Sequence, residues 1–127
     1  MPDATALDAA LRKAAVVWLG VDDHRPFPVW PLWHDATVYV LHGGAEQAAP
    51  ALAAATRLTV TVPAKGAREV LLEFAAEARA VPAGSDEWER LVPLLLPKRL
   101  NLRDAAGAAQ RWALECSLTA ITPVQPH

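Results

Sequence analysis

The sequence predicts a mainly β protein of the α+β class, with about six antiparallel strands and flanking helices. Three observations predict this class. Two apolar runs meet at the short polar turn His34-Asp35-Ala36, the glycine pair Gly43-Gly44 leads into an alanine-rich segment, and Arg57 to Val62 then alternates polar and apolar residues. Alternation with a period of two is expected of a pleated strand. Together these features indicate a β-β-α-β core.

Length and composition favour one domain over residues 1–127. A chain of 127 residues buries roughly two-thirds of the surface that its unfolded form exposes. The net charge of −2 comes with no basic cluster longer than Lys98-Arg99, which disfavours a nucleic-acid partner. No apolar run approaches the ~20 residues of a membrane span, and no basic and then apolar leader begins the chain. Cys116 is the only cysteine, so we expect a cytoplasmic protein without an internal disulfide.

The N-terminal third is predicted to form a helix and a three-stranded meander. Residues 3–15 are strong helix formers, with Asp3 or Thr5 as the cap. The β-rich run 16–21 follows and ends in a polar turn. In the hairpin, Trp30 and Trp33 have opposite parity, so we expect one to face the core and the other a groove or a dimer contact.

The middle of the chain is predicted as a helix over Glu46–Ala55, with Pro50 in its first turn or at a kink, and then two strands. The first strand, Arg57 to Val62, directs its threonines away from the core. Residues 69–80 fit both a helix and a strand. We favour the strand because a tight turn at 63–66 precedes it and because the charged residues share one parity.

The last third is predicted as a helix, a loop and a final strand. Ser85 caps a helix with an acidic first turn. Proline predicts a kink or a break before Arg99. Residues 101–110 are predicted as a loop, 112–122 as the last strand and 123–127 as a frayed tail. The buried stripe of the helix is expected to contain Trp88, Leu91, Val92, Leu95 and Leu96.

In this order of elements the chain resembles the pyridoxamine 5′-phosphate oxidase-like split β-barrel family. The residues that carry the resemblance are Pro28-Val29-Trp30 with Trp33 and Asp35, Val38-Tyr39-Val40, and Arg57-Leu58-Thr59-Val60-Thr61-Val62. The resemblance implies a six-stranded antiparallel split β-barrel with flanking helices. It also implies a homodimer that binds FMN or the deazaflavin coenzyme F-420 in a groove between subunits, and an oxidoreductase activity on a small organic substrate. Other members of the family bind haem.

One stretch departs from the family pattern. Many relatives carry Ser/Thr and Lys/Arg after the hairpin, where they hold the cofactor phosphate at a helix N-terminus. Here residues 42–50 contain no lysine or arginine and add Glu46. Two like unit charges about 4 Å apart repel by roughly 1 to 4 kcal/mol. The alternative hypothesis is therefore a non-catalytic ligand-binding or structural split-barrel dimer that has lost the phosphate contacts.

The candidate cofactor site combines planar, backbone and cationic contacts. Trp30 or Trp33 could stack on a planar ring, or pack in the core and the interface. His42, Gly43 and Gly44 could present backbone N–H groups to an anion, or only form the turn. The histidines and Cys116 have no metal-site spacing or neighbouring base, so no metal site and no catalytic side chain is predicted. Gln47 could make a polar contact or be solvated, and the Lys98-Arg99 pair could bind an anion or only complement the helix carbonyls. The candidate polar contacts are Gln47, Arg57, Lys98, Arg99 and Asn101.

Overall fold

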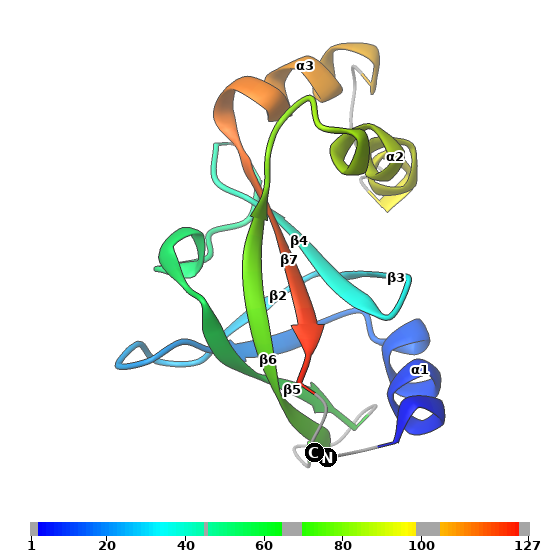
Figure 1. The fold of residues 1–127 in the computed structure, drawn as a ribbon, viewed down its shortest axis with the longest axis vertical. Coiled ribbons are helices and arrows are strands. Elements are labelled where there is room, and N and C mark those ends of the chain that lie inside the picture. The colour runs from blue at the N-terminus through cyan, green and yellow to red at the C-terminus, as the bar shows by residue number, and fades with distance from the viewer. Residues whose placement is uncertain (1–2, 45, 65–69, 99–104, 125–127) are drawn as a thin grey trace.

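The computed structural model describes residues 3–44, 46–64, 70–98 and 105–124. These residues contain a curled antiparallel sheet in the order β2-β1-β5-β6-β7-β4-β3 (Figure 1). The strands are β1 (Val17–Gly20), β2 (Phe27–Val29), β3 (Leu32–His34), β4 (Thr37–His42), β5 (Arg57–Pro63), β6 (Val70–Val81) and β7 (Ser117–Pro123). The helices are α1 (Ala4–Lys13), α2 (Asp86–Leu95) and α3 (Ala105–Glu115), with 3-10 turns η1 (Leu52–Ala54) and η2 (Leu96–Lys98).

The described sheet has seven strands, one more than predicted, because Trp30 and Pro31 divide the first arm of the hairpin into β2 and β3. Proline has no N–H group to donate to a ladder. The N–H of Trp30 is donated to the side chain of Gln47. The two halves pair with different partners, β2 with β1 and β3 with β4. The outermost strands of the sheet are thus consecutive in the chain, which curls the sheet into a split barrel.

The reversal of the hairpin lies where the sequence predicts it. His34 pairs with Thr37, so Asp35 and Ala36 form a two-residue turn, with φ angles of 49° and 55°. Positive φ at both central residues is the type I′ geometry that matches the twist of the strands. The Thr37 hydroxyl donates to the Asp35 carbonyl oxygen at 3.1 Å, which supports this turn.

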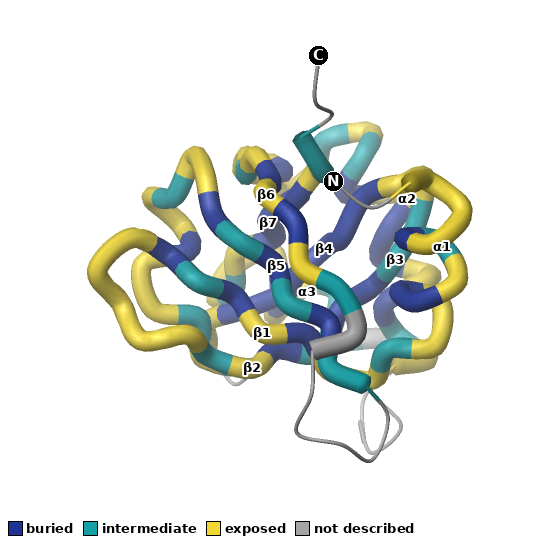
Figure 2. The backbone as a smooth tube through the Cα atoms, turned by 90° about the horizontal axis from the view of Figure 1, so that it is seen from below, coloured by how far each residue is buried: buried dark blue, intermediate teal, exposed yellow. Residues whose placement is uncertain are grey.

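Two apolar clusters lie on the two faces of the sheet. The inner cluster fills the barrel and is closed by Leu7, Ala10 and Leu11 of α1. The second cluster lies between the sheet and the pair α2 and α3, which lie together at one end of the molecule (Figure 1). Its largest members include Trp88 and Trp112. Figure 2 shows buried segments within the curled sheet and exposed loops around it.

Several predicted elements are confirmed. Helix α1 begins after Asp3, whose side chain accepts from the Ala6 N–H. Strand β5 alternates as expected, with Leu58, Val60 and Val62 buried. Residues 70–81 form a strand and not a helix, because they pair with β5 over 70–77 and with β7 over 76–81. Of the stripe predicted for α2, Trp88, Leu91, Val92 and Leu95 are buried and Leu96 is half-buried.

Helix α2 also has the predicted cap and end. Ser85 Oγ accepts from the Trp88 N–H at 3.2 Å, the contact expected of a serine N-cap. Pro93 lies inside the helix, and the chain continues from Leu95 into the 3-10 turn η2. The helix therefore ends before Arg99, as predicted.

The helix predicted over 46–55 is wrong, since η1 is the helical turn that the structure describes there. Three local features oppose a longer helix. Pro50 lacks an N–H, Ala51 has a left-handed φ of 63°, and Gln47 forms an isolated parallel bridge with His42. The alanine side chains bury too little apolar area to outweigh these features.

The loop predicted over 101–110 and the strand over 112–122 are corrected as well. Helix α3 begins at Ala105, and β7 begins at Ser117. Ala108 and Trp112, one turn apart, are both buried against α2, and this helical stripe outweighs the strand-like alternation. The predicted tail starts later than Pro123, which belongs to β7, and the Val124 N–H bonds to Ala75 O. Residues 125–127 lie outside the described residues.

Among the described residues, no helix is long and apolar enough to cross a membrane.

Candidate functional site

The outer face of β2, β1, β5 and β6, which we call the open face, carries three rows of side chains. No described helix covers it. Cross-strand pairing places Pro28, Trp18, Thr61 and Glu73 in one row and Gly20, Thr59 and Ala75 in the next. Arg57 and Glu77 form the third row. All of these residues are exposed or half-buried, and successive rows are about 7 Å apart because they are separated by two residues along a strand.

A groove of about 590 Å³ lies over the middle row. Its floor includes the small residues Gly20, Thr59 and Ala75, and Asp22, His24 and Pro26 of the loop between β1 and β2 line one side. Figure 2 shows this loop as an exposed segment of backbone. A Cβ atom at Gly20 would lie 3.8 Å from Thr59 Cβ, an ordinary contact. Packing therefore does not require glycine here, and its physical effect is to deepen the groove. The volume lies within the range of small-molecule sites.

Arg57 stands at the polar end of the groove. Its Nη2 atom lies 3.8 Å from Glu77 Oε1, and the two side chains are 75% and 64% exposed. An ion pair of this length and exposure is weak. The guanidinium group can therefore turn toward an anion in the groove. Asp22 and Glu77 also bring carboxylates to this end, so its charge is mixed.

Trp18 continues the face beside the groove, two residues before Gly20 on the same side of β1. The indole is 40% exposed. Sequence reasoning assigned a role to Trp30 and Trp33 and missed Trp18, although a signal was present. Val17 and Leu19 are the aliphatic core residues of β1, so the opposite parity turns Trp18 and Gly20 outward together.

The structure brings Trp30, His42, Gly43, Gly44 and Gln47 together, away from the lining of this groove. The Gln47 side chain accepts from the Trp30 N–H at 2.8 Å and donates to the carbonyl oxygens of Trp30 and Leu41, each at 3.0 Å. The Gly43 N–H donates to the Gln47 carbonyl oxygen. These predicted cofactor contacts are engaged within the chain.

His42 is buried and its Nε2 lies 2.9 Å from Thr119 Oγ1. Burial lowers the pKa of His42, because removal from water disfavours the charged imidazolium. At neutral pH the imidazole is therefore neutral. It is a poor partner for an anionic phosphate.

Gly43, Gly44 and Glu46 also contact the end of α3 and the residue that follows it. The Trp112 indole N–H donates to Glu46 Oε2 at 3.3 Å, and the Cys116 thiol donates to the Gly43 carbonyl oxygen at 3.3 Å. A Cβ atom at Gly44 would lie 3.0 Å from Glu115 Cβ. Burial, with the nearby Glu46 carboxylate, raises the pKa of the Cys116 thiol, which opposes a role as a nucleophile.

The remaining predicted site residues are dispersed. The Trp33 indole N–H donates to Asp8 Oδ1 at 2.9 Å and its ring packs against the inner cluster, while Trp30 packs against the outer one. Their opposite parity is thus confirmed. Lys98 is exposed at the end of η2. Arg99 and Asn101 lie outside the described residues.

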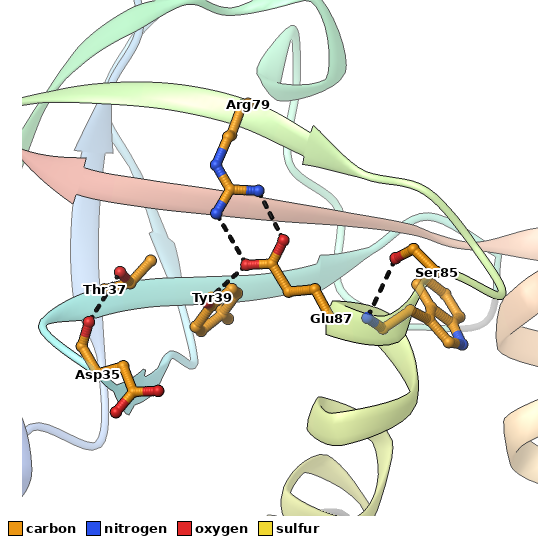
Figure 3. A network of polar contacts seen from close by, with 7 residues as sticks. Asp35, Thr37, Tyr39, Arg79, Ser85 and Glu87 are labelled. Atoms are coloured by element: carbon orange, nitrogen blue, oxygen red, sulfur yellow. Dashed lines mark hydrogen bonds and ion pairs between the residues drawn. The ribbon is translucent and has the colours of Figure 1, made fainter.

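A polar cluster marks where the open face meets α2 (Figure 3). Arg79 of β6 forms two hydrogen bonds with Glu87 of α2, at 2.7 and 2.8 Å. The Tyr39 hydroxyl donates to Glu87 Oε2 at 2.8 Å. The pKa of Glu87 falls to about 2, chiefly through Arg79, while burial and Glu87 raise the pKa of Tyr39. These groups satisfy one another, so the cluster joins α2 to the sheet.

The comparison with models of known protein families gives no match, and the comparison with curated proteins gives none either. Solved structures do match. HutZ, the heme storage protein from Vibrio cholerae, superposes with a TM-score of 0.65 at 14% identity, over 99% of this chain and 93% of that one.

Two further matches have similar values. A putative pyridoxamine 5′-phosphate oxidase from Listeria innocua has a TM-score of 0.62 at 15% identity, over 95% of this chain and 93% of that one. An FAD-binding protein from Mesorhizobium loti has a TM-score of 0.63 at 15% identity, over 98% and 91%. At these identities the likeness shows the fold.

Proposed function

We propose that this chain, whose fold is the split β-barrel of pyridoxamine 5′-phosphate oxidase-like proteins, binds a flavin-type cofactor as a homodimer. FMN and the deazaflavin coenzyme F-420 are the candidates, and the reaction is the reduction of a small organic substrate. Two of the similar structures are described as a putative pyridoxamine 5′-phosphate oxidase and an FAD-binding protein, which supports this choice of cofactor class.

The observation that carries the proposal is the groove between Trp18 and Arg57. Its floor of Gly20, Thr59 and Ala75 carries only small side chains, which would leave room for a planar ring, and the exposed Trp18 adjoins one side. Offset or edge contacts between aromatic rings are favourable. Arg57 at the other end can pair with a phosphate through two N–H groups.

The two candidate locations differ in how they fit a flavin phosphate. Among the described residues of 42–47, Gln47 and His42 already bond within the chain, Glu46 adds a carboxylate, and none begins an α-helix that would present its N-terminus. A phosphate does not fit this stretch. The groove at Arg57 offers space and an exposed guanidinium group, so its residues do fit.

A second copy of the chain would complete the site. The open face combines Trp18 and Pro28 with small residues and with charges of both signs, Arg57, Glu73 and Glu77. In a two-fold contact the apolar part of this face in one copy becomes buried against the same part of the other copy. The proposed dimer therefore covers this face and encloses the groove.

The residues that line the groove indicate what the protein and a bound cofactor would each contribute. A bound flavin would supply hydride transfer. The chain's own residues would bind and orient it: Trp18 beside the ring, the small floor beneath it, and Arg57 at the phosphate. The described lining contains no arrangement that requires a side chain to act as the catalytic acid or base.

The test is a titration of the purified protein with FMN, reduced and oxidised F-420, and haem, followed by tryptophan fluorescence. We expect saturable quenching by a flavin-type ligand. Gly20→Val should block binding by filling the floor and leave the fold stable, since valine favours strands and a Cβ has room there. Arg57→Gln should weaken binding at least about tenfold, as expected for a lost charge-assisted hydrogen bond.

Arg90→Gln is the matched control, because Arg90 is exposed on α2 outside the groove lining. It should leave the affinity unchanged. Equal weakening by both arginine variants, or quenching that survives Gly20→Val, would contradict binding in this groove.

A second candidate is a ligand-binding split barrel without redox activity. The internal bonds of Gln47 and Glu46 favour it, because they occupy the stretch in which relatives hold the cofactor phosphate. Visible absorbance of the loaded protein distinguishes the two. A bound flavin that a chemical reductant bleaches and an organic acceptor reoxidises supports the first. Saturable binding of haem or another planar anion, with no flavin binding, supports the second.

A further inference from the structure

We infer that Glu77 is an internal competitor for the anion site at Arg57, so that a ligand's phosphate or carboxylate must displace it to enter the groove. This inference deepens the proposed function and rests on it for the identity of the ligand. It concerns how the site distinguishes anionic ligands from neutral ones of the same shape.

The geometry of the pair supports displacement. Arg57 and Glu77 are direct cross-strand partners on β5 and β6, which fixes their Cα atoms opposite each other whatever the side chains do. Contact is made at one distance of 3.8 Å between side chains that are 75% and 64% exposed. A carboxylate held so loosely keeps the guanidinium group partly neutralised and still leaves it able to turn.

A second carboxylate on the same face, Glu73, allows the effect of the Arg57–Glu77 pair on anion binding to be separated from the effect of a nearby negative charge. Glu73 also projects from the outer face of β6, but it is engaged with Thr61, whose hydroxyl donates to Glu73 Oε2 at 3.0 Å. It lies four residues from Glu77 on the same strand. Glu77 is thus the β6 carboxylate paired with Arg57, and Glu73 provides a matched comparison in charge and exposure.

Displacement has a defined chemical consequence. A ligand without an anionic group leaves the Arg57–Glu77 pair intact and gains only the ring contacts. A ligand with a phosphate exchanges one weak ion pair for a charge-assisted, two-point contact. Removal of the Glu77 charge should therefore tighten binding of anions and leave binding of neutral ligands unchanged.

The experiment uses inorganic phosphate as the probe, with the isotope-labelled full chain and an NMR titration at pH 7.5 and constant ionic strength. Glu77→Gln should bind phosphate about two- to fivefold more tightly than the wild type, the range that corresponds to an exposed ion pair. Arg57→Gln should lose the phosphate-dependent shifts. Glu73→Gln should leave the affinity within about a factor of 1.5 of the wild type, and added salt should reduce the Glu77 effect.

Two results would overturn the inference: Glu77→Gln changes phosphate affinity no more than Glu73→Gln does, or Arg57→Gln leaves the shifts in place. A parallel titration compares FMN with riboflavin, which lacks the phosphate. Tighter FMN binding and unchanged riboflavin binding in Glu77→Gln support the inference. Absence of any FMN binding, with the phosphate results as expected, contradicts the proposed cofactor and still supports the competition at Arg57.

Discussion

At the level of single residues, the side-chain amide of Gln47 replaces a strand partner for Trp30. It accepts from the Trp30 N–H and donates to the Trp30 and Leu41 carbonyl oxygens. One side chain thereby connects the backbone of Trp30, between β2 and β3, to the backbone of Leu41 in β4. Without it, these backbone groups would have to find water in a half-buried location.

We expect Gln47→Ala to lower the free energy of unfolding by about 2–3 kcal/mol, because several hydrogen bonds disappear and part-buried backbone groups lose their partner. Urea denaturation measures this. Gln110→Ala, on the exposed side of α3, is the control and should change stability by less than about 0.5 kcal/mol. Equal urea midpoints for the wild type and Gln47→Ala would show that the hydrogen bonds of the Gln47 amide contribute little to stability.

His42 gives a pH dependence that can be assigned to one residue. Its folded-state pKa lies below the ordinary value of 6.5, so the unfolded chain takes up a proton that the folded chain resists. Stability therefore falls as the pH drops below about 6.5, and it is fully present above that value.

The wild type should lose up to about 1 kcal/mol between pH 7 and 5.5, relative to His42→Gln, which keeps a polar partner for Thr119 and does not titrate. Denaturation at the two pH values gives the difference. Parallel profiles for the two proteins would contradict a neutral buried imidazole.

At the level of elements, α2 is held to the sheet by apolar packing and by the Tyr39–Glu87–Arg79 cluster. The pKa of Glu87, about 2 in place of 4.5, means that the charged carboxylate is stabilised in the folded state. This contribution is present above pH 4.5 and is lost as the pH falls toward 2.

Glu87→Gln should lower stability at pH 7 by about 1–2 kcal/mol, a value discounted for solvent screening, since Arg79 is 55% exposed. The deficit should shrink between pH 4.5 and 2, below the window of His42. Glu89→Gln, on the same helix and exposed, should stay within about 0.5 kcal/mol of the wild type. Thermal unfolding of the wild type and both variants at pH 7 and near pH 2 measures these differences. A Glu87→Gln deficit that stays the same at both pH values would contradict a charged, stabilising Glu87.

Elements that are set by a local pattern of polar and apolar residues, or by a capping residue, were predictable from the sequence. Alternation in 57–62 and the serine cap at 85 identified β5 and α2, because burial and capping are local properties. The helix expected at 46–55 failed because Pro50 and the left-handed Ala51 interrupt it, and because Glu46 bonds to a residue far along the chain, Trp112. In 105–115, helix and strand patterns compete, and only the packing of Trp112 against α2 decides for the helix.

At the level of the whole molecule, the proposed dimer and the proposed site share the open sheet face. Arg57 was recognisable from the sequence as a cation at the start of a strand. The groove itself was not, because Gly20, Thr59 and Ala75 come from three strands whose pairing the sequence does not state. Trp18 had the right parity, but nothing local marked that side of β1 as open.

Trp18→Glu should convert the proposed dimer to a monomer, because each copy would bring a carboxylate into the apolar part of the contact. Sedimentation velocity at micromolar concentration measures this, with circular dichroism to check the fold. Leu114→Glu is the control: Leu114 is apolar and 87% exposed on α3, away from the open face, and its substitution should leave the dimer intact. A wild-type monomer, or a dimer that survives Trp18→Glu, would contradict this interface.

The junction at Trp30-Pro31 also bears on aggregation. Exposed edge strands offer unpaired N–H and C=O groups to which another chain can add a strand. Here the two edges are β2 and β3, each three residues long and covalently consecutive. Proline lies at their junction, and the Gln47 amide occupies the polar groups of Trp30. The break that splits the barrel thus leaves little template for strand addition, which favours a chain that stays dispersed at high concentration.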